Sequence, residues 1–183
     1  LKEFQDSLLM SQMDESNSYS YFSNFIKKNQ NQNQNQNQNF TFKAFEVHVL
    51  FYLYKMEEEY LSHYKITRII DKFIENLAPV LKEQPESLLK GQCQTFMEPF
   101  INKNKKDIIR KLTSYYNTWD NYSLSILYLH LVENIKQGYQ TQMRFMSHFQ
   151  DILYENLSPN AEQRLSLEET MIRFHQLFKY WDE

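Results

Sequence analysis

The chain has 183 residues, two glycines and a formal net charge of −3 at pH 7. So few glycines exclude a Gly-rich phosphate loop, a dinucleotide-binding fingerprint and an all-β fold with many tight turns. The slightly acidic balance gives no electrostatic basis for binding nucleic acid. The composition therefore predicts a mainly α protein, with a chain long enough for one domain.

The cysteine count and the hydropathy pattern bear on the compartment. A single cysteine, Cys93, cannot form an internal disulfide, which predicts a reducing intracellular compartment such as the cytoplasm or a virus particle. The longest apolar run starts at Val47 and stops at Lys55, well short of the 18 residues that favour a membrane span. There is no signal-peptide pattern, and Leu1 is not an initiator methionine, so we expect a fragment. The oligomeric state stays open.

Residues 1–39 are predicted to be an N-terminal segment outside the folded domain. Apolar spacing in Leu1–Met13 suits a short helix, and Asp14–Asn24 is polar and irregular. The alternating tract Asn29–Asn39 has no apolar side chain to offset ordering entropy, so we predict disorder. Four aromatic side chains in the loop-like part suit a surface that binds a protein partner: Tyr19, Tyr21, Phe22 and Phe25.

Residues 40–183 are predicted to form a single helical domain, of which 40–117 is a helical segment or insertion. The expected helices there are Phe40–Tyr64, Ile66–Leu81, a third that starts at Pro85, and Asp107–Tyr116. The second places one apolar stripe inward: Ile66, Ile69, Ile70, Phe73, Ile74 and Leu77. The third is expected to bury Leu88, Leu89, Phe96, Met97 and Phe100.

The last part, 118–183, begins with the most hydrophobic helix, Asp120–Lys136, followed by Tyr139–Leu157. In the second of these, six residues are expected to face inward: Met143, Met146, Phe149, Ile152, Leu153 and Leu157. A loop is expected at 158–164. The final helix opens with Ser-Leu-Glu-Glu, in which Ser166 and Glu169 match a capping box.

No group of residues forms a catalytic or metal-binding motif. The histidines are scattered singly, at 48, 63, 130, 148 and 175, without a partner at metal-ligand spacing. The consecutive glutamates at 57–59 point to different faces of a helix. Cys93 has no cationic neighbour that would lower its pKa. The basic side chains of 103–111 are interpreted as a solvated helix face. We therefore predict no catalytic residue, metal or cofactor in this chain.

The stretch NTWDNYSLSILYL, residues 117–129, puts a carboxylate at the start of the apolar helix. Asp120 occupies the position expected of a helix N-cap, where it would accept backbone N–H bonds. Trp119 and Tyr122 flank it, which suggests that the helix start is buried. A buried carboxylate needs further donors, so Asp120 is predicted to anchor the helix to another segment.

Two stretches resemble the large lobe of protein kinases. The sequence that follows Asp120 is similar to the central helix of that lobe, which opens Asp-x-Trp/Tyr-Ser-Leu/Phe-Gly and continues as a hydrophobic run. NAEQRLSLEE, residues 160–169, looks like the closing Asp-Pro-x-x-Arg-x-Ser/Thr-x-Glu-Glu. The two stretches occur in the same order as the corresponding motifs of the kinase lobe. The kinase-like proteins of large DNA viruses look most similar, because they carry a Thr-Trp-Asp-Asn-Tyr-like stretch after a long helical segment.

The resemblance implies structural roles for four residues. Asp120, beside Trp119, would hold the backbone of a catalytic loop, and Arg164 would form a buried ion pair with the Glu of the family's Ala-Pro-Glu element. Glu46, in Lys-Ala-Phe-Glu, is the candidate for that Glu. The chain also departs from the pattern: Ser125 replaces the usual Gly, and Ala161 replaces Pro.

This chain carries no Gly-rich loop, no Val-Ala-Ile-Lys, no His-Arg-Asp and no Asp-Phe-Gly, and no N-terminal β lobe is expected. The resemblance therefore implies the C-terminal part of a serine/threonine kinase-like protein, active or a pseudokinase. Such a part would support the catalytic loop and the peptide-docking surface. ATP and magnesium would bind only with upstream elements, and the partner would be a protein substrate. The alternative is a non-enzymatic helical interaction or structural subunit of a larger assembly.

Overall fold

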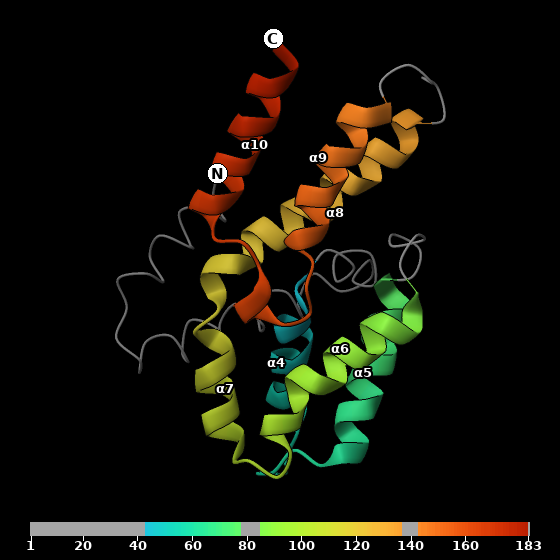
Figure 1. Cartoon of the computed structure of the whole chain (residues 1–183). Coiled ribbons are helices and arrows are strands. Elements are labelled where there is room, and N and C mark those ends of the chain that lie inside the picture. Colours follow the sequence, from blue (N-terminus) through green and yellow to red (C-terminus); the bar gives the residue numbers. More distant parts are fainter. Residues whose placement is uncertain (1–42, 78–84, 137–142, 183) are drawn as a thin grey trace, which may run out of the picture.

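A computed structural model describes residues 43–77, 85–136 and 143–182. Within these ranges the chain forms seven α-helices, α4 to α10, with short 3-10 helices and no strand beyond one isolated bridge (Figure 1). The prediction of a mainly α fold is confirmed. The expected helix at 1–13 and the Asn/Gln tract lie outside the described residues.

Helix α4 (Phe45–Lys55) is much shorter than the predicted helix Phe40–Tyr64. The backbone of Met56 is extended, and its carbonyl accepts a 2.6 Å bond from Lys105 Nζ. The N–H of Lys105 also donates to the Glu59 carbonyl at 2.7 Å. These contacts with a distant segment use backbone carbonyls that follow α4, which explains why the helix stops before the glutamates.

Helix α5 (His63–Leu77) buries all six of the apolar residues predicted to face inward. Helix α6 (Glu86–Met97) follows, with Pro85 as the residue before its first turn. One prediction for α6 is wrong, because Leu88 is 53% exposed. Cys93, four residues after Leu89, is fully buried instead, so the inward face of α6 is turned relative to the expected one.

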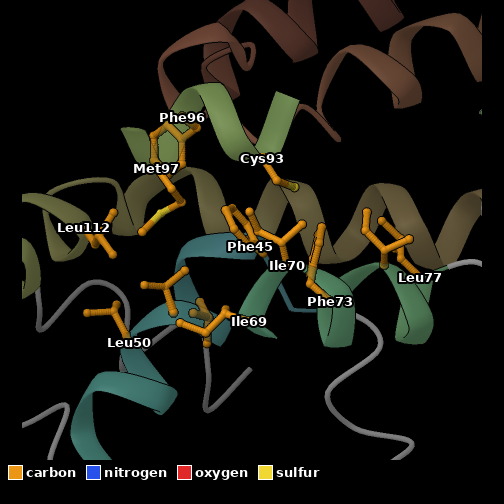
Figure 2. Close-up of a cluster of buried hydrophobic side chains, with 14 of the residues drawn as sticks. Phe45, Leu50, Ile69, Ile70, Phe73, Leu77, Cys93, Phe96, Met97 and Leu112 are labelled. Atoms are coloured by element: carbon orange, nitrogen blue, oxygen red, sulfur yellow. The ribbon is translucent and has the colours of Figure 1, made fainter. Parts of the chain in front are cut away.

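The core lies where α4, α5 and α6 meet (Figure 2). The rings of Phe45 and Phe73 are 4.8 Å apart, and Phe96 lies at 6.2 Å from Phe45 in an edge arrangement. Figure 2 shows Cys93 of α6 pointing toward this group and Leu112 at its edge. Buried aromatic and branched side chains supply most of the stabilisation of a core.

Helix α7 (Lys105–Thr113) packs on the opposite side of α4 from α5 and α6 (Figure 1). Its N-cap, Asn104, accepts a bond from the Lys106 N–H and pairs as an isolated bridge with Tyr60. The predicted helix Asp107–Tyr116 is therefore shifted toward the N-terminus, and a 3-10 helix, η2 (Tyr116–Thr118), leads directly into α8.

Helix α8 (Trp119–Lys136) and helix α9 (Met143–Glu155) pack side by side, and α10 (Leu167–Asp182) packs against α9 and projects away from the rest (Figure 1). Of the six residues predicted to face inward in Tyr139–Leu157, the last three are buried, namely Ile152, Leu153 and Leu157. Met146 and Phe149 are half-buried, and the start of that predicted helix lies outside the described residues.

Candidate functional site: the buried Glu46–Arg164 ion pair

Glu46 and Arg164 meet in a two-pronged ion pair across 118 residues of sequence. Arg164 Nη1 donates to Glu46 Oε1 at 2.9 Å, and Nη2 donates to Oε2 at 2.6 Å. The two side chains are 1% and 0% exposed. This is the strongest geometry available to an arginine and a carboxylate, because two parallel charged hydrogen bonds form at once. The two residues that the resemblance paired therefore bond each other in the structure.

Arg164 also binds two further segments. Its Nε donates to the Ser158 carbonyl at 2.7 Å, and Nη1 donates to Thr118 Oγ1 at 3.0 Å. The guanidinium carbon lies 4.8 Å from the ring centre of Tyr122, within the range of a cation–π contact. One side chain thus connects the first turn of α4, the entry to α8 and the loop before α10.

The pair is suited to holding structure rather than to proton transfer. Both oxygens of Glu46 already accept guanidinium N–H bonds, so neither is available to a substrate. Removing one partner of a buried pair typically costs about 3–5 kcal/mol, because the other charge is left without compensation. The chemical consequence is a fixed position for Arg164 and for the chain that leads into α8.

Asp120 is not placed as predicted. It lies in the first turn of α8 rather than before it, and it is exposed. Two residues on, Tyr122 is fully buried. Since residues two apart in a helix are separated by about 200°, burying Tyr122 turns Asp120 outward. The prediction of a buried start to this helix is therefore wrong for the carboxylate, while Trp119 is half-buried against the core.

The buried polar residue of α8 is the next one, Asn121. Its Nδ2 donates to Asn156 Oδ1 at 3.1 Å and to Thr170 Oγ1 at 2.8 Å. Thr170 Oγ1 donates to the same Asn156 oxygen at 3.2 Å, and Asn156 Nδ2 donates to Ser125 Oγ at 3.2 Å. We call these four residues the amide network. The sequence analysis did not predict this network. Its only trace in the sequence is the amide side chain of Asn121 within an apolar helix.

Two titratable side chains near the pair are held neutral by burial. Desolvation raises the pKa of the Tyr122 hydroxyl well above its ordinary value, and the Arg164 charge only partly offsets this. Burial likewise raises the pKa of the Cys93 thiol, with the Glu46 charge adding to the effect. A thiol without thiolate character is a poor nucleophile. Cys93 is fully buried and packs within the core.

A second link ties α7 to the loop before α10. Tyr115 Oη donates to Glu162 Oε1 at 2.6 Å, and Lys111 Nζ donates to the same oxygen at 3.0 Å. The bond from Tyr115, with help from Lys111, holds the pKa of Glu162 below its ordinary value. Lys111 and Glu162 are exposed and Tyr115 is half-buried, so the contact positions the loop and contributes little to stability.

The residues that the structure describes contain no group of three or more His, Cys, Asp or Glu side chains able to hold a metal ion. No helix among them is long and apolar enough to cross a membrane. A hollow of about 530 Å³ lies between α5 and α6, and two of its lining residues, Asp71 and Lys90, already pair with each other.

Comparisons with protein-family models, with curated proteins and with solved structures found no match for this chain. The candidate site is therefore interpreted from its own geometry.

Proposed function

We propose that this chain is the C-terminal part of a divergent serine/threonine protein kinase-like protein. In that role it would support the catalytic loop and shape the peptide-docking surface, while ATP binds elements upstream. The protein partner is then a substrate, and the chain by itself is not catalytic.

The Glu46–Arg164 pair carries this proposal. Among all the acidic and basic side chains of the chain, the resemblance pairs Glu46 with Arg164. These two side chains form hydrogen bonds of 2.6 and 2.9 Å in the interior. In the proposed protein, the pair fixes the segment that ends at α4 against the loop before α10. The capping bonds of Ser166 and Glu169 are also in the place that the closing motif implies.

A phosphotransfer assay on the complete protein that contains these 183 residues tests the proposal. The protein is purified, and transfer of radiolabelled phosphate from ATP to a protein substrate is measured. In an active kinase, Asp120→Ala should lower kcat by about 10- to 100-fold through loss of catalytic-loop positioning. Its free energy of unfolding should change little, because the carboxylate is exposed in this chain.

Asp107→Ala is a matched control. Asp107 is also an exposed acid in the first turn of a helix, α7, so the variant reproduces the change in helix-end charge. Equal activities of the two variants would remove the anchoring role from Asp120. A complete protein without His-Arg-Asp and Asp-Phe-Gly elements before Leu1 would overturn the proposal.

One observation favours a second candidate, a non-enzymatic helical interaction subunit. Asp120 is exposed, and so are apolar side chains on the same helix, as on a protein whose surface meets a partner. A pseudokinase lies between the two candidates. A complete protein that carries kinase-like elements but transfers no phosphate would favour the pseudokinase, and one without those elements would favour the subunit.

A further inference from the structure

Helix α10 carries an exposed apolar row along one side. Leu167, Met171 and Phe178 are 59%, 64% and 50% exposed, and Phe174 between them is half-buried. Their spacings of four, three and four residues are those of the a and d positions of a coiled coil, and at 100° per residue they share an arc of about 60°. We call these four residues the α10 seam. A seam of this kind normally packs against another helix.

Helix α9 covers only the edge of the α10 seam. The centre of the Phe174 ring lies 5.2 Å from that of Phe149, and the centre of the Phe178 ring lies 5.7 Å from that of Phe145. Phe178 is still 50% exposed despite this contact, and Met171 is the most exposed residue of the seam. The middle of the seam therefore faces outward.

The apolar surface continues from the α10 seam across α9 to α8. The Phe149 ring also meets the Tyr128 ring of α8 in an edge arrangement, with 6.1 Å between the ring centres. Tyr128, Leu124 and Leu131 share an arc of about 60° on α8 and are 41%, 49% and 47% exposed. Single exposed apolar residues are ordinary on a protein surface, whereas a contiguous group across three helices indicates an interface.

The exposed apolar area is close to what a stable dimer uses. Six large side chains, three of α8 and three of the α10 seam, are each exposed by roughly half. A large apolar side chain has about 200 Å² of surface, so the six together present roughly 600 Å². This matches the upper end of the largest patch on a typical monomer, about 600 Å². With a polar rim it approaches the area of about 800 Å² that each partner buries in a standard interface.

The charges beside the α10 seam favour a second copy of this chain, packed antiparallel. Glu168 and Lys179 are exposed and lie about 20° apart around the helix axis, so they flank the same side of the seam at its two ends. A two-fold axis through the middle of the seam brings Glu168 of each copy near Lys179 of the other. A parallel pair would instead place each charge beside its own equivalent, which is unfavourable. Antiparallel packing also opposes the two helix dipoles favourably.

We propose that two copies of this chain form a two-fold dimer in which their α10 seams pack antiparallel. The α10 helix of each copy then also lies over the adjoining rings of α9 and toward the exposed side of α8 in the other. Because α10 projects away from the rest of the chain, a second copy can approach the seam along its length (Figure 1). The inference does not rest on the proposed function, because it uses only the surface of these helices.

Sedimentation velocity of the 183-residue chain over a range of concentrations tests the proposal. An interface of this area should give a monomer–dimer equilibrium with a Kd in the micromolar range or below. Met171→Lys puts a charge into the exposed middle of the seam, so it should raise Kd at least about 100-fold without unfolding the chain. Ile172→Lys is the matched control, because Ile172 is 49% exposed on the same helix but lies outside the seam. It should change Kd by less than about threefold.

Charge exchange tests the antiparallel orientation. Glu168→Lys and Lys179→Glu each place like charges near one another across the two-fold axis, so each should raise Kd by about fivefold. The double variant restores opposite charges and should return Kd to within about twofold of wild type. In a parallel pair, by contrast, each single exchange leaves like charges facing like. Single variants that associate as the wild type does would therefore overturn the antiparallel arrangement.

Three other outcomes would overturn the dimer itself. A chain that stays monomeric at about 100 μM, well above the expected Kd, does not use this surface for self-association. Equal Kd values for Met171→Lys and Ile172→Lys would show that the α10 seam is not the interface. Assemblies larger than a dimer would indicate a contact that does not close on a two-fold axis. Circular dichroism of each variant verifies folding, and no ATP is present, so this result is independent of that for the proposed function.

Discussion

Asn121 shows how one polar side chain can specify a helix arrangement inside an apolar environment. Its amide reaches both Asn156 and Thr170, so α8, the end of α9 and α10 share one set of hydrogen bonds. A buried network is favourable only when its members are satisfied. The amide network therefore fixes the register of these helices, which apolar contacts alone would leave less defined.

Asn156→Ala should destabilise the protein by about 2–3 kcal/mol, because it leaves the Asn121 amide and two hydroxyls in the interior with fewer partners. Urea unfolding at pH 7 measures the change. Gln163→Ala, in the exposed 3-10 helix η3 (Ala161–Gln163), is the control and should change the free energy of unfolding by less than about 0.5 kcal/mol. Equal effects would contradict the role of the network.

Tyr122→Phe should be tolerated. The Tyr122 hydroxyl is buried and has no hydrogen-bond partner among the described residues, while its ring packs on the Arg164 guanidinium. Removing an unbonded buried hydroxyl while keeping the ring should change the free energy of unfolding by less than about 1 kcal/mol, or raise it. Thermal unfolding with a matched denaturant series checks this. A loss above about 2 kcal/mol would reveal a bond at the hydroxyl.

At the scale of elements, α10 is defined at its start by local chemistry. Ser166 Oγ accepts the Glu169 N–H at 3.2 Å, and Glu169 Oε2 accepts the Ser166 N–H at 2.8 Å. The predicted capping box is confirmed. Helix α4 illustrates the opposite case, because its end depends on contacts from Lys105, about 50 residues away.

The capping box should make the stability of α10 depend on pH. The hydroxyl and N–H bonds from Ser166 lower the pKa of Glu169 below its ordinary value. A lowered folded-state pKa contributes stability that is present above the unfolded value and is lost as pH falls through the folded one. Ser166→Ala should therefore lower the free energy of unfolding at pH 7. The difference in this free energy between the variant and wild type should shrink toward pH 3.

Urea unfolding at several pH values, followed by circular dichroism, measures this effect. Glu168→Gln, at the adjacent exposed position, is the control for loss of a carboxylate in the same helix turn. A Ser166→Ala difference that stays constant from pH 7 to pH 3 would show that Glu169 ionisation does not support the cap.

At the scale of the whole molecule, the Glu46–Arg164 pair joins the first described helix to the loop before the last. It also holds Thr118 at the entry to α8. The core of α4, α5 and α6 and the packing of α8, α9 and α10 meet at this point, so the pair couples the two parts of the fold.

Arg164→Met should cost about 3–5 kcal/mol of unfolding free energy, because it leaves Glu46 charged and buried. The double variant with Glu46→Leu should recover much of that loss, since no charge then remains uncompensated. Arg173→Met breaks an exposed pair with Glu155 and should cost less than about 1 kcal/mol. Denaturant unfolding of wild type, both single variants, the double variant and Arg173→Met tests these statements, and additive effects of Arg164→Met and Glu46→Leu would contradict the coupling.

Local pattern by itself determined the helical class, the inward stripe of α5 and the cap of α10, because each depends on residues within one or two turns. It also named Glu46 and Arg164, through a resemblance rather than through periodicity. The outward turn of Asp120, the length of α4 and the exposure of Leu88 were decided only by tertiary structure.

The physical reason is clearest in α8. Its sequence is apolar on every side, so periodicity cannot select the face that enters the core. The choice is made by distant partners, Arg164 against Tyr122 and Asn156 against Asn121. These contacts turn Asp120 outward, together with Leu124, Leu127 and Leu131.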